Sequence, residues 1–435
     1  MKTEQFVQNK KNKTVNQTFR LADATSIKGQ NRVKKKNLWV VTELYYPEET
    51  STGYYLTKIA EGLTDDFNVK VLCGQPNYSG RGIRTAKREI HKKVEIFRAL
   101  GTTLDKNVLL FRLVNMLTLS CSIFLKALLN FQKNDQILVV TTPPSLPFVT
   151  AIASLIRGGS YILLIHDNYP EILIAVGKTG EKSFLVKAIN FFNRQLYKYA
   201  SQIIVVGRDM EKLVASKTHG LNVPIIYIPN WAESEDVQPQ PRETNGLLKE
   251  LSLENKFVFL YAGNMGYPND LESIVWCAEK LKENKDFHFI FLGAGVKKKW
   301  LESEVKEKKL ANVTLLSPKP RSEQNTFLNA CDVAIVSLID KMRGVSMPSR
   351  TYNILAVGKP ILALAEQDSE VAKVVDEDKV GWVVPPNKPE ELFQTVLKIF
   401  NERTTIKQLE MNSRKSALEK YSLEQAILKY KNVLR

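Results

Sequence analysis

The sequence predicts an α/β protein made of two facing, doubly wound (Rossmann-like) domains. Short apolar runs rich in β-branched residues alternate with helix-length stretches, a pattern typical of parallel strands joined by right-handed crossovers. The alternation stops at a polar, proline-containing stretch, residues 232–245, and then starts again. The length of 435 residues also fits two or three domains with ordinary buried cores.

The first domain is expected to span residues 37–231. Its first strand, Leu38 to Thr42, is followed by a loop that reaches Gly53 and by a helix over residues 54–63. Further apolar runs predict strands over residues 68–72, 94–99, 136–141, 161–165 and 202–206. The segment from Ile225 to Trp231 closes this domain, and residues 232–245 form the linker.

The second domain is expected to span residues 246–420, with the same alternation. Its predicted strands cover residues 257–262, 287–293, 313–317, 333–336 and 360–363, and its predicted helices include residues 271–283 and 351–357. Residues 421–435 are expected to form a C-terminal helix that returns to the first domain. In open parallel sheets ligands bind beyond the carboxyl ends of the strands, so the loops there are the candidates for a site.

The net charge of +16 is unevenly distributed along the chain. Residues 1–36 contribute +8, residues 37–230 contribute +7, and residues 231–435 contribute only +1. Residues 1–36 are interpreted as a basic, disordered tail. A basic first half suits phosphate groups, whether in nucleic acid, anionic lipid or a lipid diphosphate.

The cysteines and the N-terminus indicate a cytoplasmic protein. Four cysteines lie far apart, without a CxxC pair or zinc-ligand spacing, and are expected to be buried thiols in a reducing compartment: Cys73, Cys121, Cys277 and Cys331. The first 37 residues contain no hydrophobic segment of the kind found in a secretory signal.

One apolar segment, residues 108–131, raises the question of a membrane. Arg112 and Lys126 leave only thirteen uninterrupted residues between them, and a spanning helix needs about 20. The segment Ser145 to Asp167 is likewise interrupted, by Arg157 and two glycines. Both are expected to be buried helices or strands, and for the first an interfacial position on a membrane stays open.

Glycine-rich turns follow two predicted strands of the second domain. The turn Gly263 to Gly266 lets a ligand approach the backbone closely, and Gly293 and Gly295 follow the next strand in the same way. No third glycine completes a dinucleotide fingerprint, and three lysines follow, which argues against NAD. Further along, Ser349 and Arg350 begin a helix and would form a diphosphate site. The alternatives are a plain turn and a surface ion pair of Arg350.

Ionisable residues follow a strand of the first domain. His166, Asp167 and Glu171 come directly after the predicted strand at 161–165 and are expected to point into the cleft between the domains. Thr52 and Gly53 lie in the loop after the first strand, where the amides of a helix start would meet a substrate oxygen or phosphate. The alternatives are a structural histidine and an ordinary loop.

Nine short motifs occur in the order of a known family. The chain resembles the family 4 retaining glycosyltransferases of GT-B fold, within them the branch of fucosamine transferases of O-antigen synthesis and fucosyltransferases of colanic-acid synthesis. The resemblance spans Asn37 to about Tyr421 and excludes the tail. The motifs are Tyr45-Tyr46-Pro47 with Gly53, Gln75-Pro76-Asn77-Tyr78, Thr141-Thr142-Pro143-Pro144, Asp167-Asn168-Tyr169-Pro170-Glu171, Val205-Val206-Gly207, Ile228-Pro229-Asn230, Tyr261-Ala262-Gly263-Asn264-Met265-Gly266, Pro348-Ser349-Arg350 and Ala356-Val357-Gly358-Lys359-Pro360.

The resemblance implies a division of labour between the domains. The second domain would bind a nucleotide-diphosphate sugar, and the first would bind a saccharide acceptor, often lipid-linked, without a metal or other cofactor. His166, Asp167 and Glu171 would act at the transferred sugar or orient the acceptor. The acceptor-binding candidates are Thr52, Gly53 and Asn77. The donor-binding candidates are Gly263, Asn264, Gly266, Gly293, Gly295, Ser317, Arg321, Ser349, Arg350 and Asn353.

The chain departs from the family pattern at four positions. Many members carry two glutamates with seven residues between them before the Ala-x-Gly-x-Pro turn, where this chain has Val345 and Asn353. The usual arginine and lysine after the donor-domain glycine are Asn264 and Asn269 here. The change at Asn353 affects expected contacts to the ribose or the sugar.

The expected function is retaining glycosyl transfer in cell-surface polysaccharide synthesis, on a cytoplasmic protein that binds an anionic membrane surface peripherally. Two alternatives are a non-hydrolysing nucleotide-sugar epimerase, which shares the fold, and a catalytically silent relative that serves as a scaffold or subunit. A nucleic-acid partner is not expected, because no recognition helix or aromatic, basic sheet motif accompanies the charge.

Overall fold

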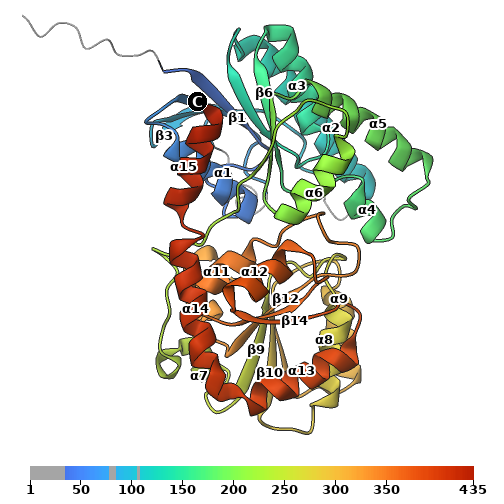
Figure 1. The fold of residues 1–435 in the computed structure, drawn as a ribbon, viewed down its shortest axis with the longest axis vertical. Helices are drawn as coiled ribbons and strands as arrows, with labels where there is room; N and C mark the ends of the chain where they lie inside the picture. Colours follow the sequence, from blue (N-terminus) through green and yellow to red (C-terminus); the bar gives the residue numbers. More distant parts are fainter. Residues whose placement is uncertain (1–34, 78–84, 105–107) are drawn as a thin grey trace, which may run out of the picture. The chain divides into compact units, whose positions relative to one another are not determined.

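The structure, a computed structural model, describes residues 35–77, 85–104 and 108–435. Nearly all of the predicted basic tail, and Tyr78 of the family motifs, lie outside the described residues. Figure 1 shows two α/β domains, the first coloured blue to green and the second yellow to red. The predicted fold class of two doubly wound domains is confirmed.

The N-terminal sheet has eight strands among the described residues, in the order β3-β4-β2-β1-β5-β6-β7-β8. Only the β3–β4 pair in this sheet is antiparallel. The strands are β1 (Asn37–Val41), β2 (Asn68–Cys73), β3 (Arg88–His91), β4 (Val94–Arg98), β5 (Gln136–Val140), β6 (Ser160–Ile165), β7 (Gln202–Val205) and β8 (Ile225–Tyr227). The apolar strands that the sequence predicts therefore form the centre of the sheet.

The edge strand β3 is a difference from the sequence prediction. It forms a hairpin with β4 through Lys92 and Lys93, which both have positive φ. Its four residues include a single apolar side chain, Ile90, and that side chain is 76% exposed. A strand whose half-buried positions are polar, Glu89 and His91, leaves no periodic apolar signal in the sequence.

Helices flank the N-terminal sheet. They are α1 (Ser51–Gly62), α2 (Leu109–Asn130), α3 (Leu146–Arg157), α4 (Glu171–Ala175), α5 (Phe184–Tyr199) and α6 (Arg208–Lys217). Helix α3 packs against β5 and β6 and contacts α2 and α5, so these three helices form one layer (Figure 1). The first helix begins at Ser51, earlier than predicted, because the Thr50 side chain caps it by accepting a hydrogen bond from the Gly53 amide.

Helix α2 is long and apolar enough to cross a membrane by length and composition, which corrects the sequence argument based on Arg112 and Lys126. Only 22% of an 18-residue apolar stretch of this helix is buried inside the protein, so the expectation of a buried helix is also wrong. Cys121 on this helix is exposed, whereas the other three cysteines are buried as predicted. The exposed apolar face is compatible with the interfacial position that the sequence left open.

The C-terminal sheet has six parallel strands in the order β11-β10-β9-β12-β13-β14. The strands are β9 (Phe257–Ala262), β10 (Phe287–Leu292), β11 (Val313–Leu316), β12 (Val333–Ser337), β13 (Ile361–Leu364) and β14 (Gly381–Val384). One face of β9 and β10 is lined with phenylalanine, and the rings of Phe259 and Phe289 stack with centroids 5.3 Å apart. This aromatic packing stabilises β9 and β10, the two strands that lead into the glycine turns.

The helices of this domain complete the doubly wound pattern. They are α7 (Gly246–Glu250), α8 (Leu271–Lys280), α9 (Lys298–Glu307), α10 (Gln324–Leu328), α11 (Arg350–Ala356), α12 (Glu370–Asp378), α13 (Pro389–Asn401) and α14 (Ile406–Glu419), with short 3-10 turns at Arg242–Thr244, Arg321–Glu323 and Arg403–Thr405.

Two segments connect the domains. The linker begins after Trp231, and the Ala232 amide donates to the Tyr421 carbonyl at 2.8 Å, so the linker runs beside the segment that leads to the last helix. That helix, α15 (Leu423–Leu434), lies against α1 of the first domain (Figure 1). Ile427 fills the space beside Gly62, and Lys431 pairs with Asp66 at 2.9 Å.

Candidate functional site

The two glycine turns of the second domain interlock. The amides of Gly263 and Met265 donate to carbonyls of the β10 strand and its loop, at 2.9 and 2.8 Å. A Cβ on Gly293 would lie 2.0 Å from the Gly263 carbonyl oxygen, and one on Gly295 would lie 2.3 Å from that of Met265. The second pair of glycines is therefore required by backbone packing, and it fixes the shape of the first turn.

Arg350 lies directly against the first turn. Its Nη2 donates to Asn269 Oδ1 at 2.8 Å, and its guanidinium carbon lies 4.7 Å from the centre of the Tyr261 ring. A Cβ on Gly263 would come within 2.4 Å of Arg350 Nη1. Gly263 is thus needed for the arginine to reach the turn, and Arg350 lies next to the turn; their shared binding of a diphosphate stays a prediction.

Asn269, which stands where the family usually has a lysine, connects these parts. Its side-chain amide donates to the Asn264 carbonyl at 3.0 Å while its oxygen accepts from Arg350. The Lys297 ammonium donates to the Asn269 carbonyl at 2.8 Å and pairs with Glu272. A lysine charge is therefore present beside the turn, supplied from the next loop.

Two backbone amides of the turn have no hydrogen-bond partner among the described residues, and Gly266, which carries one of them, is buried. The hydrogen bonds of the described residues use the Gly263 and Met265 amides and leave those of Asn264 and Gly266 without a partner. The Asn264 side chain is exposed. Ser317 is exposed at the end of β11, and the structure adds nothing to its predicted role.

A small polar cavity of about 120 Å³ lies where the two domains meet. Four predicted site residues line it: Thr52, His166 and Asp167 from the first domain and Ser349 from the second. Ser51, Tyr55, Val206, Asn230 and Met347 complete the lining. The structure therefore brings together residues from separate parts of the sequence, and Ser349 is followed directly by Arg350 at the start of α11.

The adjacent His166 and Asp167 have pKa values shifted in opposite directions. Burial lowers the pKa of His166 to about 4, so its imidazole is neutral at pH 7. Burial raises the pKa of Asp167 to about 6, partly offset by a hydrogen bond from Thr142. The Nε2 atom of His166 is shielded from solvent and has no hydrogen-bond partner among the described residues. An enclosed, unpaired nitrogen at a cavity is suited to a hydroxyl group of a ligand.

Backbone contacts between the domains hold this region in place. The Asn168 amide donates to the Val345 carbonyl at 2.8 Å, and the Asn168 side chain donates to the Gly344 carbonyl at 2.7 Å. Asp167 forms an antiparallel bridge with Ser346. Val345, at the position of a usual family glutamate, therefore contributes its carbonyl to this contact while its side chain is buried.

The predicted acceptor residues do not all gather at the cavity. Thr52 lines it, but the Gly53 amide, expected to be free for a substrate, donates to the Thr50 cap at 3.3 Å. Among the described residues, the amides at this helix start without a hydrogen-bond partner are those of Ser51 and Thr52. The Asn77 amide donates to the Glu48 carboxylate, and Asn77 is not among the lining residues.

Glu171 is also outside the cavity. Its carboxylate pairs with Lys217 of α6 at 2.7 Å, and the same ammonium donates to the Tyr169 carbonyl at 2.8 Å. The structure gives Glu171 a role in tying α4 to α6, which differs from its predicted position at the reacting sugar.

Arg321 and Asn353, predicted to bind the donor, both contact Glu233 of the linker. Arg321 Nε donates to Glu233 Oε2 at 2.9 Å, and the arginine stacks on the Tyr54 ring with its guanidinium carbon 3.8 Å from the centroid. The Asn353 side-chain amide donates to Glu233 Oε1 and accepts from the Glu233 backbone amide at 3.0 Å. Sequence reasoning missed Glu233, because it lies in a linker without periodicity. A carboxylate is thus present beside Asn353, although it comes from another part of the chain.

We expect Glu233 and Arg321 to be energetically coupled. The Glu233 side chain is 3% exposed, so Glu233→Ala removes a buried partner and should destabilise the fold. Breaking a buried pair costs about 3–5 kcal/mol, and partial exposure of Arg321 reduces this to about 1–3 kcal/mol. A double-mutant cycle with Arg321→Ala, measured by denaturant unfolding, should show a coupling of at least about 1 kcal/mol. Additive effects would show that the two groups stabilise the fold independently.

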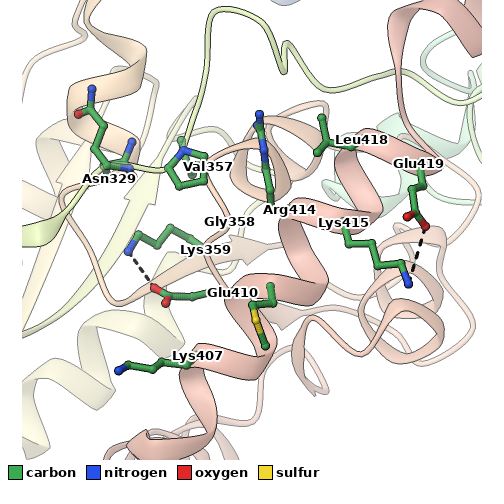
Figure 2. Close-up of a pocket in the computed structure, with 13 residues that line it drawn as sticks. Asn329, Val357, Gly358, Lys359, Lys407, Glu410, Arg414, Lys415, Leu418 and Glu419 are labelled. Atoms are coloured by element: carbon green, nitrogen blue, oxygen red, sulfur yellow. Dashed lines mark hydrogen bonds and ion pairs between the residues drawn. The ribbon is translucent and has the colours of Figure 1, made fainter.

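A larger cavity of about 710 Å³ contains none of the predicted site residues (Figure 2). It lies between the linker, the turn at Gly358 and helix α14. Lys359 pairs with Glu410 at 3.1 Å, and Arg414 donates to the carbonyls of Ala356 and Val237. The Arg414–Val237 contact ties the linker to α14, and the other two contacts tie the turn at Gly358 to the same helix.

The comparisons with known proteins fit this arrangement. Residues 247–416 match the family model described as glycosyl transferases group 1. The probable glycosyltransferase WbjE of Pseudomonas aeruginosa is 30% identical over 361 residues, covering 82% of this chain and 88% of the relative. WcaI of Escherichia coli K12, whose name assigns it to glycosyl transfer in colanic acid biosynthesis, is 25% identical over 350 residues. The match covers 76% of this chain and 84% of WcaI.

Solved structures share the fold. The Anabaena protein HepE, in a crystal structure with UDP-glucose, superposes with a TM-score of 0.67 at 15% identity and covers 92% of this chain and 99% of its own. Together with the extent of the match to WbjE, the two doubly wound domains show that this chain belongs to the glycosyl transferases group 1 family and is a glycosyltransferase of GT-B fold.

Proposed function

We propose that this protein transfers a sugar, with retention of configuration, from a nucleotide-diphosphate sugar to a lipid-linked saccharide in cell-surface polysaccharide synthesis. The observation that carries the proposal is the polar cavity in which His166 and Asp167 of the first domain meet Ser349 of the second, next to Arg350 and the glycine turn. The name of WcaI and the nucleotide sugar bound to HepE support the role in polysaccharide synthesis and the donor class.

In the proposed reaction the second domain holds the leaving diphosphate. The Arg350 guanidinium and the free amides of Asn264 and Gly266 would stabilise the charge that develops as the bond to the sugar breaks. Preformed donors of this kind need no reorganisation during the reaction, because the interlocked glycine turns already fix them. No metal is required in this proposal, and transfer should persist in a chelator.

The first domain would act on the sugar and the acceptor. The neutral His166 imidazole would hydrogen-bond a hydroxyl of the transferred sugar, and the Asp167 carboxylate would orient the attacking hydroxyl on the same face as the departing diphosphate. The sugar acquires oxocarbenium character in this step, so a nearby carboxylate also stabilises it.

A panel of nucleotide sugars tests the donor proposal. A ligand present at 100 times its dissociation constant adds about 2.7 kcal/mol to the free energy of unfolding, which thermal unfolding detects readily. We expect one nucleotide-diphosphate sugar to raise Tm and the corresponding free sugar to leave it unchanged. A panel without any stabilising nucleotide or nucleotide sugar contradicts the donor assignment.

We also propose that the protein binds the cytoplasmic face of a membrane through its basic tail and first domain. These parts carry +15 of the net charge of +16, and each cation near an anionic surface contributes about 1 kcal/mol. The protein should therefore sediment with anionic vesicles at low ionic strength and be released at high salt, because salt screens this attraction. Deletion of residues 1–36 should weaken sedimentation but leave transfer to a soluble acceptor analogue intact. Failure to bind anionic vesicles at low salt would make a soluble acceptor the better assignment.

A further inference from the structure

An apolar cavity of about 420 Å³ lies between helices α3 and α5, on the layer that also includes α2. Its walls are formed largely by Pro144, Phe148, Ile152, Ile189, Phe192 and Leu196. This volume lies within the range of sites for small organic ligands. Nothing in the donor or sugar chemistry described above uses it.

The lining of the cavity includes both a residue of the candidate site and residues exposed on the protein surface. At its inner end it is lined by Asp167, which also lines the polar cavity with His166. At its outer end are Ile152 and Phe192, whose side chains are 52% and 57% exposed. Asp167 therefore lines both the polar cavity and the apolar cavity, and the apolar cavity is also lined by surface-exposed side chains.

Helices α2, α3 and α5 carry both exposed apolar side chains and cations. Leu129, Ile156 and Phe184 on the three helices are 81%, 64% and 87% exposed. The same helices contain no aspartate or glutamate, and their six cations are Arg112, Lys126, Arg157, Lys187, Arg194 and Lys198. Exposed apolar residues and cations on the same helices suit a ligand that combines a hydrocarbon chain with phosphate.

We propose that this cavity, the α3–α5 groove, binds the hydrocarbon chain of the lipid-linked acceptor and so places the acceptor saccharide at Asp167. This inference rests on the proposed function and adds to it a chain-binding subsite separate from general membrane attachment. Each buried methylene group favours binding, so affinity should increase with chain length until the groove is filled.

Two matched double variants distinguish binding in the groove from membrane attachment through neighbouring residues. Ile152→Ser with Phe192→Ser alters the groove, whereas Ile156→Ser with Phe191→Ser removes similar apolar area from the same two helices outside it. Phe191 and Phe192 are adjacent and are 60% and 57% exposed, so the two pairs should affect membrane attachment about equally.

The first readout does not depend on catalysis. A benzophenone-tagged farnesyl phosphate should crosslink to α3 and α5 in the wild-type protein and in the control pair, and crosslinking should fall at least tenfold in the groove pair. Equal crosslinking in both pairs, or crosslinks that map only outside the groove, would overturn the proposal. A dimer that buries these helices in solution, seen by sedimentation, would also overturn it by assigning the groove to a second copy.

The second readout is transfer. The groove pair should raise KM for a long-chain lipid-linked acceptor at least tenfold, with kcat and the KM for a short-chain, water-soluble acceptor unchanged. An equal increase in KM in both pairs would mean that the helices contribute only to membrane attachment. If the wild type transfers sugar to neither acceptor but still crosslinks the probe in the groove, the proposed function fails while the groove assignment stands.

Discussion

Asp167→Asn is expected to lower turnover at least about 100-fold while making the folded protein more stable at pH 8. The loss of turnover follows from the proposed role of the Asp167 carboxylate at the reacting sugar, because removing one electrostatic contact to a transition state typically costs about 10²–10³ in rate. The gain in stability follows from the raised pKa of Asp167, about 6, because an ionised and enclosed carboxylate opposes folding.

The sign of the stability change depends on pH. The pKa of Asp167 is raised on folding, so the folded state binds its proton more tightly between about pH 4 and 6, and this group's contribution to stability falls as pH rises through that window. At pH 8 the free energy of unfolding of Asp167→Asn should therefore exceed that of the wild type by about 1–3 kcal/mol. Each kcal/mol corresponds to roughly 2–4 °C in Tm, and the difference should vanish at pH 4. Thermal unfolding of both proteins at the two pH values measures it.

The pH dependence of turnover supplies a second test of the same residue. The wild-type rate should fall as the pH drops below about 6, where Asp167 becomes protonated, and the residual rate of Asp167→Asn should lack this transition. Asp65→Asn, at a carboxylate that is 75% exposed, is the control and should change neither rate nor stability appreciably. If Asp167→Asn loses stability at pH 8, Asp167 has a structural role instead.

Arg350→Ala is expected to weaken binding of the nucleotide diphosphate about ten- to a hundredfold. A charge-assisted hydrogen bond contributes about 1.5–3 kcal/mol, and the position of Arg350 against Gly263 places its remaining N–H groups at the turn. Calorimetric titration measures this affinity directly.

Two further variants test whether the loss of affinity is specific to the Arg350 guanidinium. Arg350→Lys should recover only part of the affinity, because an ammonium cannot form the paired hydrogen bonds of a guanidinium. Arg343→Ala removes a guanidinium with a 54% exposed side chain from the preceding loop and should leave the affinity unchanged. Unchanged affinity in Arg350→Ala would remove this residue from the donor site.

The sequence predicts the fold well where burial imposes a pattern. The central strands of both sheets are short apolar runs, and they appear within a residue or two of their predicted bounds. The edge strand β3 escapes prediction because its half-buried positions are polar. The start of α1 is misplaced by three residues because the cap at Thr50 is set by one side-chain hydrogen bond.

Parts of the site are predictable for a similar reason. His166 and Asp167 follow β6 of the N-terminal sheet, and Ser349 lies in the loop after β12 of the C-terminal sheet. They line one cavity because loops at the carboxyl ends of strands in both sheets meet there. Three other predicted residues do not line this cavity, because each has a partner that the sequence does not reveal. Glu171 pairs with Lys217, and Arg321 pairs with Glu233, which are distant in sequence. The Gly53 amide donates to the Thr50 side chain through the local geometry of the helix start. The α3–α5 groove could not be predicted from the sequence, since it depends on how two helices pack.

The most direct test of the central proposal is transfer of radiolabelled sugar from a panel of nucleotide sugars to a membrane extract. We expect the full-length protein to move label from one nucleotide sugar into the organic-solvent-soluble lipid fraction, with retained anomeric configuration, and Asp167→Asn to reduce that label at least about 100-fold. Conversion of the nucleotide sugar into its epimer without transfer would contradict the proposal in favour of an epimerase. Donor binding without any transfer would contradict it in favour of a catalytically silent scaffold.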